Sequence, residues 1–199
     1  MSEIVKHNYY QFGPYLAEFR NIDKAFCDKL LKLGQQSKIP HNQHLAGKIK
    51  KERLLPNEEW ITKGFSPYVH SYMTGYNVWS KHTKHPSWFL KSCWINFQKQ
   101  FEFNPPHIHT NCDLSFVLWL KVPQIILKEH HKDISTGHKS GCTVFKYGED
   151  ITFTSNEKVF FPIERTFIIF PARLQHYVVP HKSKATRVSV AGNIKFDGI

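Results

Sequence analysis

Several features that would point to a secreted or membrane protein are scarce or missing in this sequence. No apolar stretch approaches the roughly 20 residues that a membrane-spanning helix needs, and the first residues lack the apolar core of a secretion signal. The four cysteines lie far apart and form no CxxC pair, so we expect them to be reduced and mostly buried. These absences predict a cytoplasmic protein without a membrane partner.

Acidic residues are also few. The 199-residue chain has 27 Lys and Arg against 16 Asp and Glu, a formal net charge of +11, and its densest basic cluster is KIKKER at 48–53. Such an excess favours association with nucleic acid, another polyanion or an acidic protein, although solubility alone explains it equally well. The composition, 41% hydrophobic and 15% aromatic, indicates a folded globular protein rather than a disordered one.

The first 87 residues have the pattern of helices. Residues 21–36 predict a helix that Asn21 caps and that ends before Pro40. Its apolar side chains recur at spacings of four, four and three: Ile22, Phe26, Leu30 and Leu33. Further helices are expected to begin near Pro56 and at Ser66, which Pro67 follows at the first helical position. Between them, residues 40–52 have polar turn chemistry and predict an exposed loop.

Residues 88–199 consist of short runs of β-branched and aromatic residues, separated by turn signals at short intervals. This texture is typical of an antiparallel sandwich or barrel. The sequence shows no internal repeat and no low-complexity linker that would divide it. We therefore predict a single domain over residues 1–199, in which a mostly helical N-terminal layer (1–87) packs on a β core (88–199).

Two histidines stand two residues apart in NPPHIHTNCDLSFVLWL, residues 104–120. Side chains at i and i+2 of a strand point to the same face. His107 and His109 would therefore face one way together, while Ile108 points into the core. Paired imidazoles on one face suit a metal ion, although such a pair in a β protein is also often structural or simply on the surface.

The segments FPARLQHYVVP and TRVSVAGNI add a further histidine and an arginine. Arg187 and Ser189 share one strand face by alternation, and Arg187 lies eleven residues after His176. If the two strands form a hairpin centred on His181 and Lys182, His176 and Arg187 lie opposite each other, about 5 Å apart at Cβ. A guanidinium beside a metal would bind a carboxylate bidentately. This pattern favours a ligand that is an acid at one end and a chelator at the other.

Taken together, HxH, a distal histidine in FPxxxxH and R-x-S eleven residues beyond it resemble the 2-oxoglutarate- and Fe(II)-dependent oxygenases, in their prolyl-hydroxylase-like branch. The likeness covers residues 94–123 and 167–194, and these segments look closest to the short versions carried by tailed phages of marine bacteria. The resemblance implies an α+β, mainly β fold: a double-stranded β-helix, or cupin-like jelly roll, with the metal at its open end. A phage-encoded protein would act in the host cytoplasm.

The resemblance also implies a set of iron ligands. The family's motif is HxD or HxE followed by a distal histidine, which gives a facial triad of two histidines and one carboxylate. His107 takes the first position and His176 the last, but His109 stands where the carboxylate belongs. Either His109 binds iron and the site has three histidines, or Asp113 reaches across the turn as an oxygen ligand. Asp113 would otherwise orient a ligand or cap the strand.

For the co-substrate, the resemblance implies that Arg187 pairs with the distal carboxylate of 2-oxoglutarate and that Ser189 adds a hydroxyl. Asn96 and Gln98 alternate on the strand just upstream of the HxH motif. They would hydrogen-bond to 2-oxoglutarate as well, or form the exposed polar face of an edge strand.

The implied activity is an oxygenase that uses Fe(II), 2-oxoglutarate and O2, and couples oxidative decarboxylation of 2-oxoglutarate to hydroxylation of a C–H bond. The expected substrate is a peptidyl side chain, with protein or peptide favoured over nucleic acid. Residues 40–56 and 124–141 are long enough to form a substrate wall or lid, and the histidines at 130, 131 and 181 are expected in solvent. The alternatives are a cupin-like metalloprotein that does not use 2-oxoglutarate, and a non-catalytic jelly-roll binding module.

Overall fold

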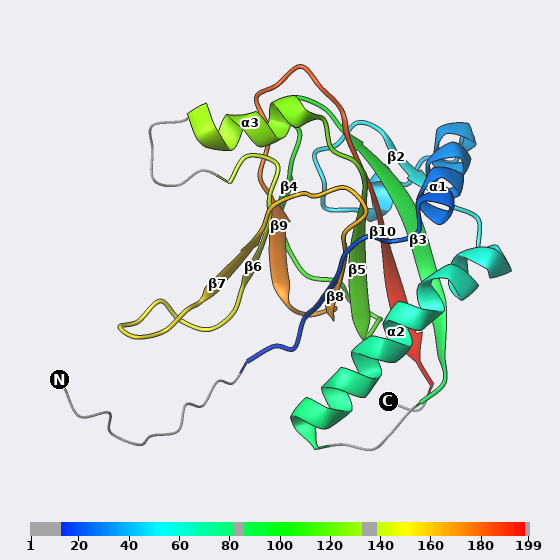
Figure 1. Cartoon of the computed structure of the whole chain (residues 1–199), viewed down its shortest axis with the longest axis vertical. Coiled ribbons are helices and arrows are strands. Elements are labelled where there is room, and N and C mark those ends of the chain that lie inside the picture. The colour runs from blue at the N-terminus through cyan, green and yellow to red at the C-terminus, as the bar shows by residue number, and fades with distance from the viewer. Residues whose placement is uncertain (1–12, 82–85, 133–138, 198–199) are drawn as a thin grey trace.

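The computed structural model describes residues 13–81, 86–132 and 139–197. Its strands form two antiparallel sheets that face each other, and helices α1 and α2 cover the outer face of the larger sheet (Figure 1). The larger sheet has the order β1-β8-β5-β10-β3-β2, with bounds Ala17–Phe19, Phe167–Pro171, Leu114–Lys121, Arg187–Phe196, Trp88–Gln98 and Glu52–Leu54. The smaller has the order β4-β9-β6-β7, with bounds Asn104–His107, Gln175–Val178, Thr143–Lys146 and Glu157–Phe160. The helices are α1 (Lys24–Gln36), a 3-10 turn (Asn42–His44), α2 (Glu59–Ser80) and α3 (Gln124–Lys132).

Helix α1 begins two residues later than the sequence pattern predicts. Its cap is Asp23, whose Oδ1 accepts a hydrogen bond from the backbone N–H of Phe26 at 2.7 Å. Asn21 instead has a φ of 58° in the turn that precedes the helix. Gly34, taken as an end signal, lies within the helix, where a Cβ would stand 2.4 Å from Ile95 Cδ1. That glycine allows α1 to lie close against the sheet.

A single helix, α2, replaces the two that Pro56 and Ser66–Pro67 predict. Pro67 lies inside it, where the missing N–H and the ring cost roughly 3 kcal/mol. An apolar stripe runs through the proline and packs on the sheet, and the ring centroids of Phe65 and Phe116 are 4.5 Å apart. The buried side chains of the stripe are Ile61, Phe65, Val69 and Tyr72. Each contributes about 1.5–3 kcal/mol by burial, so together they outweigh the proline.

The larger sheet is buried on both faces, and its side chains alternate between two apolar clusters. Ile95 and Leu118 belong to the cluster under the helices, whereas Trp119 and Ile168 belong to the cluster between the sheets. On the face that points towards the smaller sheet, strands β3 and β10 carry polar side chains in place of apolar ones. There the register sets polar side chains opposite each other, Arg187 against Gln98 and Ser189 against Asn96. The space between the sheets is therefore polar at this edge.

The predicted hairpin between the strands of His176 and Arg187 is wrong. Strand β9 lies between β4 and β6 in the smaller sheet, whereas β10 lies between β5 and β3 in the larger one. The connection between them crosses from one sheet to the other, as the strands of a jelly roll do. His176 and Arg187 consequently approach each other from facing sheets.

His181 lies in this connection and is fully buried, which corrects the expectation that it is solvated. Its Nε2 is 3.3 Å from the carbonyl of Gln98, and its Nδ1 is 3.1 Å from the carbonyl of Ser183. The sequence did not indicate this burial, because the neighbours of His181 along the chain are polar and its contact with Gln98 is made to the distant strand β3. The side chains at 130 and 131 lie outside the described part of the chain. Among the described helices, none has the length and apolarity to cross a membrane.

Candidate active site

Strands β4 and β9 bring three histidines together. His107 lies directly opposite His176 in the β4–β9 register, and the N–H of His109 donates to the carbonyl of Ala172 at 2.9 Å. One ring nitrogen from each histidine lies within 4.8 Å of the other two. The Nε2 atoms of His109 and His176 are 3.3 Å apart. The fold thus preforms a three-nitrogen site from segments that are far apart in the sequence.

Backbone carbonyls orient two of these rings. Nδ1 of His107 is 2.7 Å from the carbonyl of Pro105, and Nδ1 of His176 is 2.8 Å from that of Leu174. A neutral imidazole that donates from Nδ1 presents the lone pair of Nε2 to a metal. The two carbonyls therefore hold the rings in the tautomer that metal binding requires.

The three imidazoles are neutral at neutral pH. Burial, together with the neighbouring His107 and His109, lowers the pKa of His176 to about 3, against the opposing effect of the Leu174 carbonyl. Burial, together with the neighbouring His107, lowers the pKa of His109 to about 4. Burial also lowers the pKa of His107, against the opposing effect of the Pro105 carbonyl. A metal would thus not have to displace protons from these ligands.

The histidines line a cavity of about 110 Å³ between the two sheets. Residues 44–49, in the segment predicted to be an exposed loop, supply part of its wall, with Ile49 buried. The segment 40–52 is otherwise largely an exposed loop, as predicted, and a substrate wall at 40–56 stays a prediction. The polar and titratable side chains on the wall are His44, Asn96, Asn104, His107, His109, Thr143, His176, Arg187 and Ser189.

Arg187 lines this cavity, and no acidic residue in the described part of the chain forms an ion pair with it. It is 2% exposed, and its Nη1 donates to the carbonyl of Gly141 at 2.5 Å, while no described residue bonds to its Nε. Burial lowers the pKa of Arg187 to about 10, so the guanidinium stays charged at neutral pH. A buried charge without a counterion is costly. The site is therefore built to receive an anion.

The remaining candidates for co-substrate binding are not equivalent. Ser189 and Asn96 are buried on the cavity wall, and Asn96 Oδ1 has no hydrogen-bond partner among the described residues. Gln98 is fully buried but is not part of the wall. Its Nε2 donates to the carbonyl of Glu102 at 2.5 Å. The structure thus brings two of these three side chains to the cavity.

Asp113 lies outside the histidine trio. Lys195 Nζ is 3.0 Å from its Oδ1, and the backbone N–H of Phe196 donates to its Oδ2 at 2.8 Å. Both carboxylate oxygens are thus engaged in fastening the start of β5 to the end of β10. This geometry is that of a strand cap, one of the readings that the sequence left open.

Thr143 is a cavity residue that the sequence did not reveal. It lies on β6 opposite Val178 of β9, is 3% exposed, and its Oγ1 has no partner among the described residues. Alternation puts it on the same face as Phe145, which is opposite His176. The alternation in CTVF, residues 142–145, identifies Thr143 as a cavity residue only once the pairing of this strand with β9 is known.

The donor set and the cavity fit Fe(II) and 2-oxoglutarate. Imidazole nitrogens are suitable ligands for iron, as for several other transition metals. Buried polar atoms without partners among the described residues, namely Arg187 Nε, Asn96 Oδ1 and Thr143 Oγ1, surround the same small volume. Native proteins rarely leave such atoms unpaired. A carboxylate would accept from Arg187 Nε and Thr143 Oγ1, and a water molecule could donate to Asn96 Oδ1.

The family model of 2OG-Fe(II) oxygenases matches residues 92–193, just over half of the chain. No curated protein matches the chain significantly. Several solved structures share the fold. The viral collagen prolyl hydroxylase of Paramecium Bursaria Chlorella virus-1, in its 2OG complex, has a TM-score of 0.59 at 12% identity, over 92% of this chain and 96% of that chain.

Two further structures carry other molecules. The prolyl hydroxylase of Trichoplax adhaerens, in complex with a hypoxia inducible factor peptide fragment, has a TM-score of 0.58 at 13% identity, over 92% of this chain and 84% of that one. HygX of Streptomyces hygroscopicus, with nickel, 2-oxoglutarate and hygromycin B, has a TM-score of 0.56 at 6% identity, over 92% and 84%.

These likenesses confirm the predicted double-stranded β-helix and, at such low identity, show the fold alone. The match to the family model reaches further, because it spans just over half of the sequence and includes every histidine of the trio. The chain belongs to the family of 2OG-Fe(II) oxygenases, enzymes that use Fe(II), 2-oxoglutarate and O2.

Proposed function

We propose that this oxygenase hydroxylates a C–H bond of a peptidyl side chain, with His107, His109 and His176 as its Fe(II) ligands. The observation that carries the proposal is the sharing of one cavity by three neutral imidazoles and a buried guanidinium without a counterion. A metal site alone is common to many activities. A metal site beside a receptor for a carboxylate fits a co-substrate that chelates at one end and is held at the other.

The co-substrate is proposed to lie along the inner face of β10. Arg187 binds its distal carboxylate through the unpaired side of the guanidinium, and Ser189 donates its hydroxyl to the same ligand. Asn96 and Thr143 satisfy their free polar atoms with the ligand or with its bound water. Gln98 supports β3 behind the wall, opposite Arg187, rather than contacting the ligand.

Iron, when bound, supplies the activation of O2 that converts 2-oxoglutarate to succinate and carbon dioxide and oxidises a substrate C–H bond. The chain's own residues bind and orient. The carbonyls of Pro105 and Leu174 hold the rings of two iron ligands, and Arg187 fixes the direction of the co-substrate. Apolar neighbours such as Phe170 and Val117 restrict water. No protein base or nucleophile is required.

His109, rather than Asp113, is proposed to complete the metal site. Its Nε2 lies 3.3 Å from that of His176, whereas the carboxylate of Asp113 is occupied by Lys195 and the N–H of Phe196. Asp113→Asn should therefore leave the affinity for Fe(II) unchanged. His109→Asp restores the family's usual carboxylate and should still bind Fe(II). A large loss of metal affinity in Asp113→Asn would contradict this assignment.

A peptidyl substrate is supported by the small volume of the cavity. About 110 Å³ lies below the usual range of ligand pockets, roughly 300–1,000 Å³, so the cavity suits a substrate that brings one side chain to it better than one that has to enter whole. The resemblance to short versions encoded by tailed phages of marine bacteria belongs to the same proposal, and implies that the enzyme acts in the host cytoplasm.

The proposal is tested without air. Fe(II) is added to the metal-free protein and 2-oxoglutarate follows, while the visible charge-transfer absorption of the chelate is recorded. A band that requires both additions, and that bleaches in air as succinate forms, is the expected result. Iron binding without a band would favour a metalloprotein that does not use 2-oxoglutarate. Absence of iron binding would favour a non-catalytic module.

A further inference from the structure

The cavity has an unusual balance of charge. Among the described residues that line it, none is Asp or Glu, whereas Arg187 and four histidines are present. The family pattern would put a carboxylate at the position of His109. Its replacement by a neutral imidazole removes the one negative charge that the protein would contribute.

This balance matters once the cavity is filled, as the proposed function requires. A divalent cation and the dianion of 2-oxoglutarate cancel each other, which leaves the charge of Arg187 uncompensated. Uncompensated charge in a buried site is costly unless an opposite charge comes near. The substrate is the component that approaches last, so it is the one able to bring that charge.

The carboxylates of Glu52 and Glu102 do not line the cavity. Glu102 accepts hydrogen bonds from the backbone N–H groups of Lys50 and Lys99, at 3.2 Å and 2.8 Å. Glu52 is fully buried behind the wall formed by residues 44–49. Burial and the charge of Glu102 raise the pKa of Glu52 to about 7, and no cation is among the causes. Neither group therefore balances Arg187.

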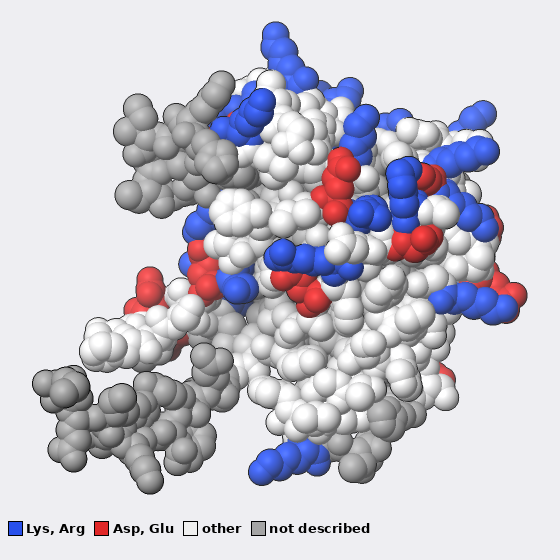
Figure 2. All heavy atoms as spheres, viewed as in Figure 1, with Lys and Arg blue, Asp and Glu red and all other residues white. Residues whose placement is uncertain are grey.

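Exposed cations adjoin, along the chain, segments that form the cavity or hold its histidines. Lys48 and Lys50 flank the cavity residue Ile49 and are exposed, with no ion pair to any described residue. Arg173 is exposed beside Ala172, whose carbonyl accepts a hydrogen bond from the N–H of His109. Over the upper part of Figure 2, around α1, β2 and the connection into β10, Lys and Arg outnumber Asp and Glu.

The size of the cavity separates two kinds of anionic substrate. A nucleobase has to leave its stack and enter a closely fitting pocket before it can react. A cavity of about 110 Å³ is too small to enclose a nucleobase together with 2-oxoglutarate, whereas a peptide stays outside and needs to bring only one side chain to the cavity. The charge then lies on the parts of the peptide that remain at the rim.

We infer that the substrate is an acidic peptide segment, which presents carboxylates to the exposed cations while one side chain enters the cavity. This inference rests on the proposed function and names its substrate class. The lysines and Arg173 attract and align the segment, and a carboxylate close to the reacting side chain balances Arg187.

The test uses the full chain, loaded without air with Fe(II) and 2-oxoglutarate, and fluorescein-labelled peptides read by fluorescence anisotropy. The peptides share one sequence, except that Glu, Gln or Lys flanks the central residue. We expect the Glu peptide to bind at least tenfold more tightly than the Gln peptide, and the Lys peptide to bind weakest. In Lys48→Glu/Arg173→Glu, affinity for the Glu peptide should fall at least tenfold. His109→Asp, which restores a negative charge to the site, should reduce the preference for Glu.

The matched control is Lys32→Glu/Lys63→Glu, which makes the same change in net charge on the helices behind the larger sheet. It should keep the wild-type affinities. Equal binding of the Glu and Gln peptides, binding of none of them, or an equal loss in control and rim variants would each overturn the inference. So would tighter binding of a single-stranded oligonucleotide of the same charge. These outcomes are distinct from failure of the proposed function, which would appear as absence of the chelate band.

Discussion

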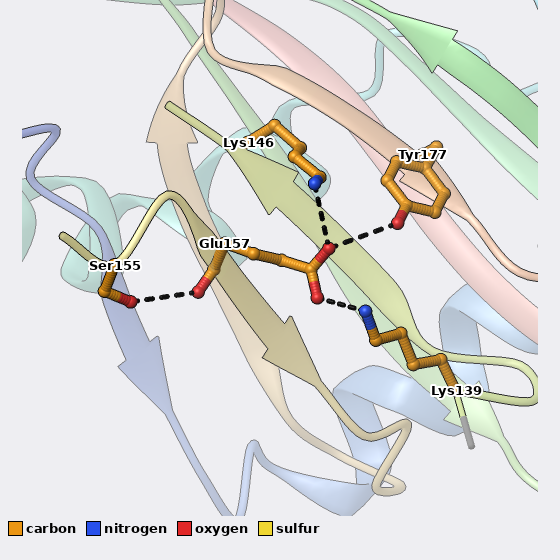
Figure 3. A network of polar contacts seen from close by, with 5 residues as sticks. All are labelled: Lys139, Lys146, Ser155, Glu157 and Tyr177. Carbon is orange, nitrogen blue, oxygen red and sulfur yellow. Dashed lines mark hydrogen bonds and ion pairs between the residues drawn. The ribbon is translucent and has the colours of Figure 1, made fainter. Parts of the chain in front are cut away.

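Two polar clusters of this molecule meet their hydrogen-bonding needs in opposite ways. The first surrounds Glu157 on the β6–β7 hairpin (Figure 3). Its carboxylate contacts Lys139 through one oxygen, and Lys146 Nζ and Tyr177 Oη through the other, both at 3.4 Å. Ser155 Oγ donates to the carbonyl of Glu157 at 3.5 Å. The carboxylate of this cluster is paired entirely by its own members, with one lysine charge in excess, and solvent reaches it.

The second cluster is the cavity, where Arg187, Asn96 and Thr143 each keep a buried polar atom without a partner among the described residues. Among the described residues, eight buried polar atoms lack a partner, and four of them, Asn104 Oδ1 included, converge on this one cavity. The difference teaches where function lies: a self-sufficient cluster stabilises the folded chain, while an incomplete one awaits a ligand. Substitutions in the two clusters should therefore have separable effects.

The largest expected effect comes from His176→Ala, which removes one of the three proposed ligands. Loss of a group that merely orients a ligand typically lowers metal affinity 10–100-fold, so loss of a ligand should lower it by more than about 100-fold. The thermal stabilisation by added metal should disappear as well, because it depends on the ratio of metal concentration to Kd. Anaerobic calorimetry with Fe(II) measures the first, and a melting curve the second.

His44→Ala is the matched control, because His44 lines the same cavity but is not part of the trio. It should keep the wild-type metal affinity. An equal loss of metal affinity in both variants would mean that the trio is not the specific metal site of the cavity. The contrast between the two polar clusters would then lose its support.

Arg187→Ala is expected to have the next largest effect, on 2-oxoglutarate alone. Truncation of one partner of a buried charge pair costs about 2–5 kcal/mol, which is about 30-fold or more in affinity. Ser189→Ala should cost about 0.5–1.5 kcal/mol, as expected for one neutral hydrogen bond. Calorimetric titration of the metal-loaded protein with 2-oxoglutarate measures both. If Arg187→Ala reduced metal affinity as strongly, the division of roles between the two sheets would be wrong.

The sequence predicted the chemistry of the site better than the path of the chain that builds it. Local spacing is enough to find the HxH pair, the distal histidine and R-x-S, because each motif spans only a few residues, although His109 lies just beyond the end of β4. The hairpin was a wrong inference because eleven residues between His176 and Arg187 fit equally a tight turn or a crossing between sheets. The same crossing buries His181, which its polar neighbours had suggested was exposed.

What the sequence missed depends on pairing between distant segments. Thr143 becomes a cavity residue only through the register of β6 against β9. The wall at residues 44–49 is polar in sequence and is held in place by the backbone bond from Lys48 to the carbonyl of Phe103, at 2.7 Å. Pro67 predicted a helix start, but tertiary burial of a continuous apolar stripe overrode that local preference.

Low pH should lower the stability of the metal-free protein, because the folded chain holds its buried histidines neutral. The pKa of His176 is about 3 and that of His109 about 4 in the folded chain, against an ordinary 6.5. Below about pH 6.5 the unfolded chain binds protons that the folded chain does not, so stability falls as the pH drops from 6.5 towards 4. Each unit of pKa difference corresponds to about 1.4 kcal/mol at most.

His109→Gln should flatten this dependence, because it removes one histidine that must stay neutral. Urea unfolding at several pH values between 7.5 and 5 measures the slope for both proteins. Equal slopes would mean that the trio does not set the acid sensitivity, and that its imidazoles are less sheltered than their burial indicates.

The smallest expected effects come from a pair of substitutions with opposite consequences. Glu157→Gln should lower the free energy of unfolding by about 1 kcal/mol or less, because the cluster is partly exposed. Lys139 and Lys146 hold the pKa of Glu157 below its ordinary 4.5, against the effect of burial, so this contribution is present above that pH and is lost as the pH falls through the lowered value. Affinity for 2-oxoglutarate should not change.

Thr143→Val should do the reverse. It replaces a buried hydroxyl without a partner among the described residues by a methyl group of similar shape, so it should leave stability unchanged or raise it slightly while 2-oxoglutarate binds more weakly. Chemical unfolding and co-substrate titration on both variants provide the measurement. A stability loss in Thr143→Val as large as in Glu157→Gln would show that the hydroxyl is already satisfied in the free protein, and Thr143 would then belong with the self-sufficient cluster.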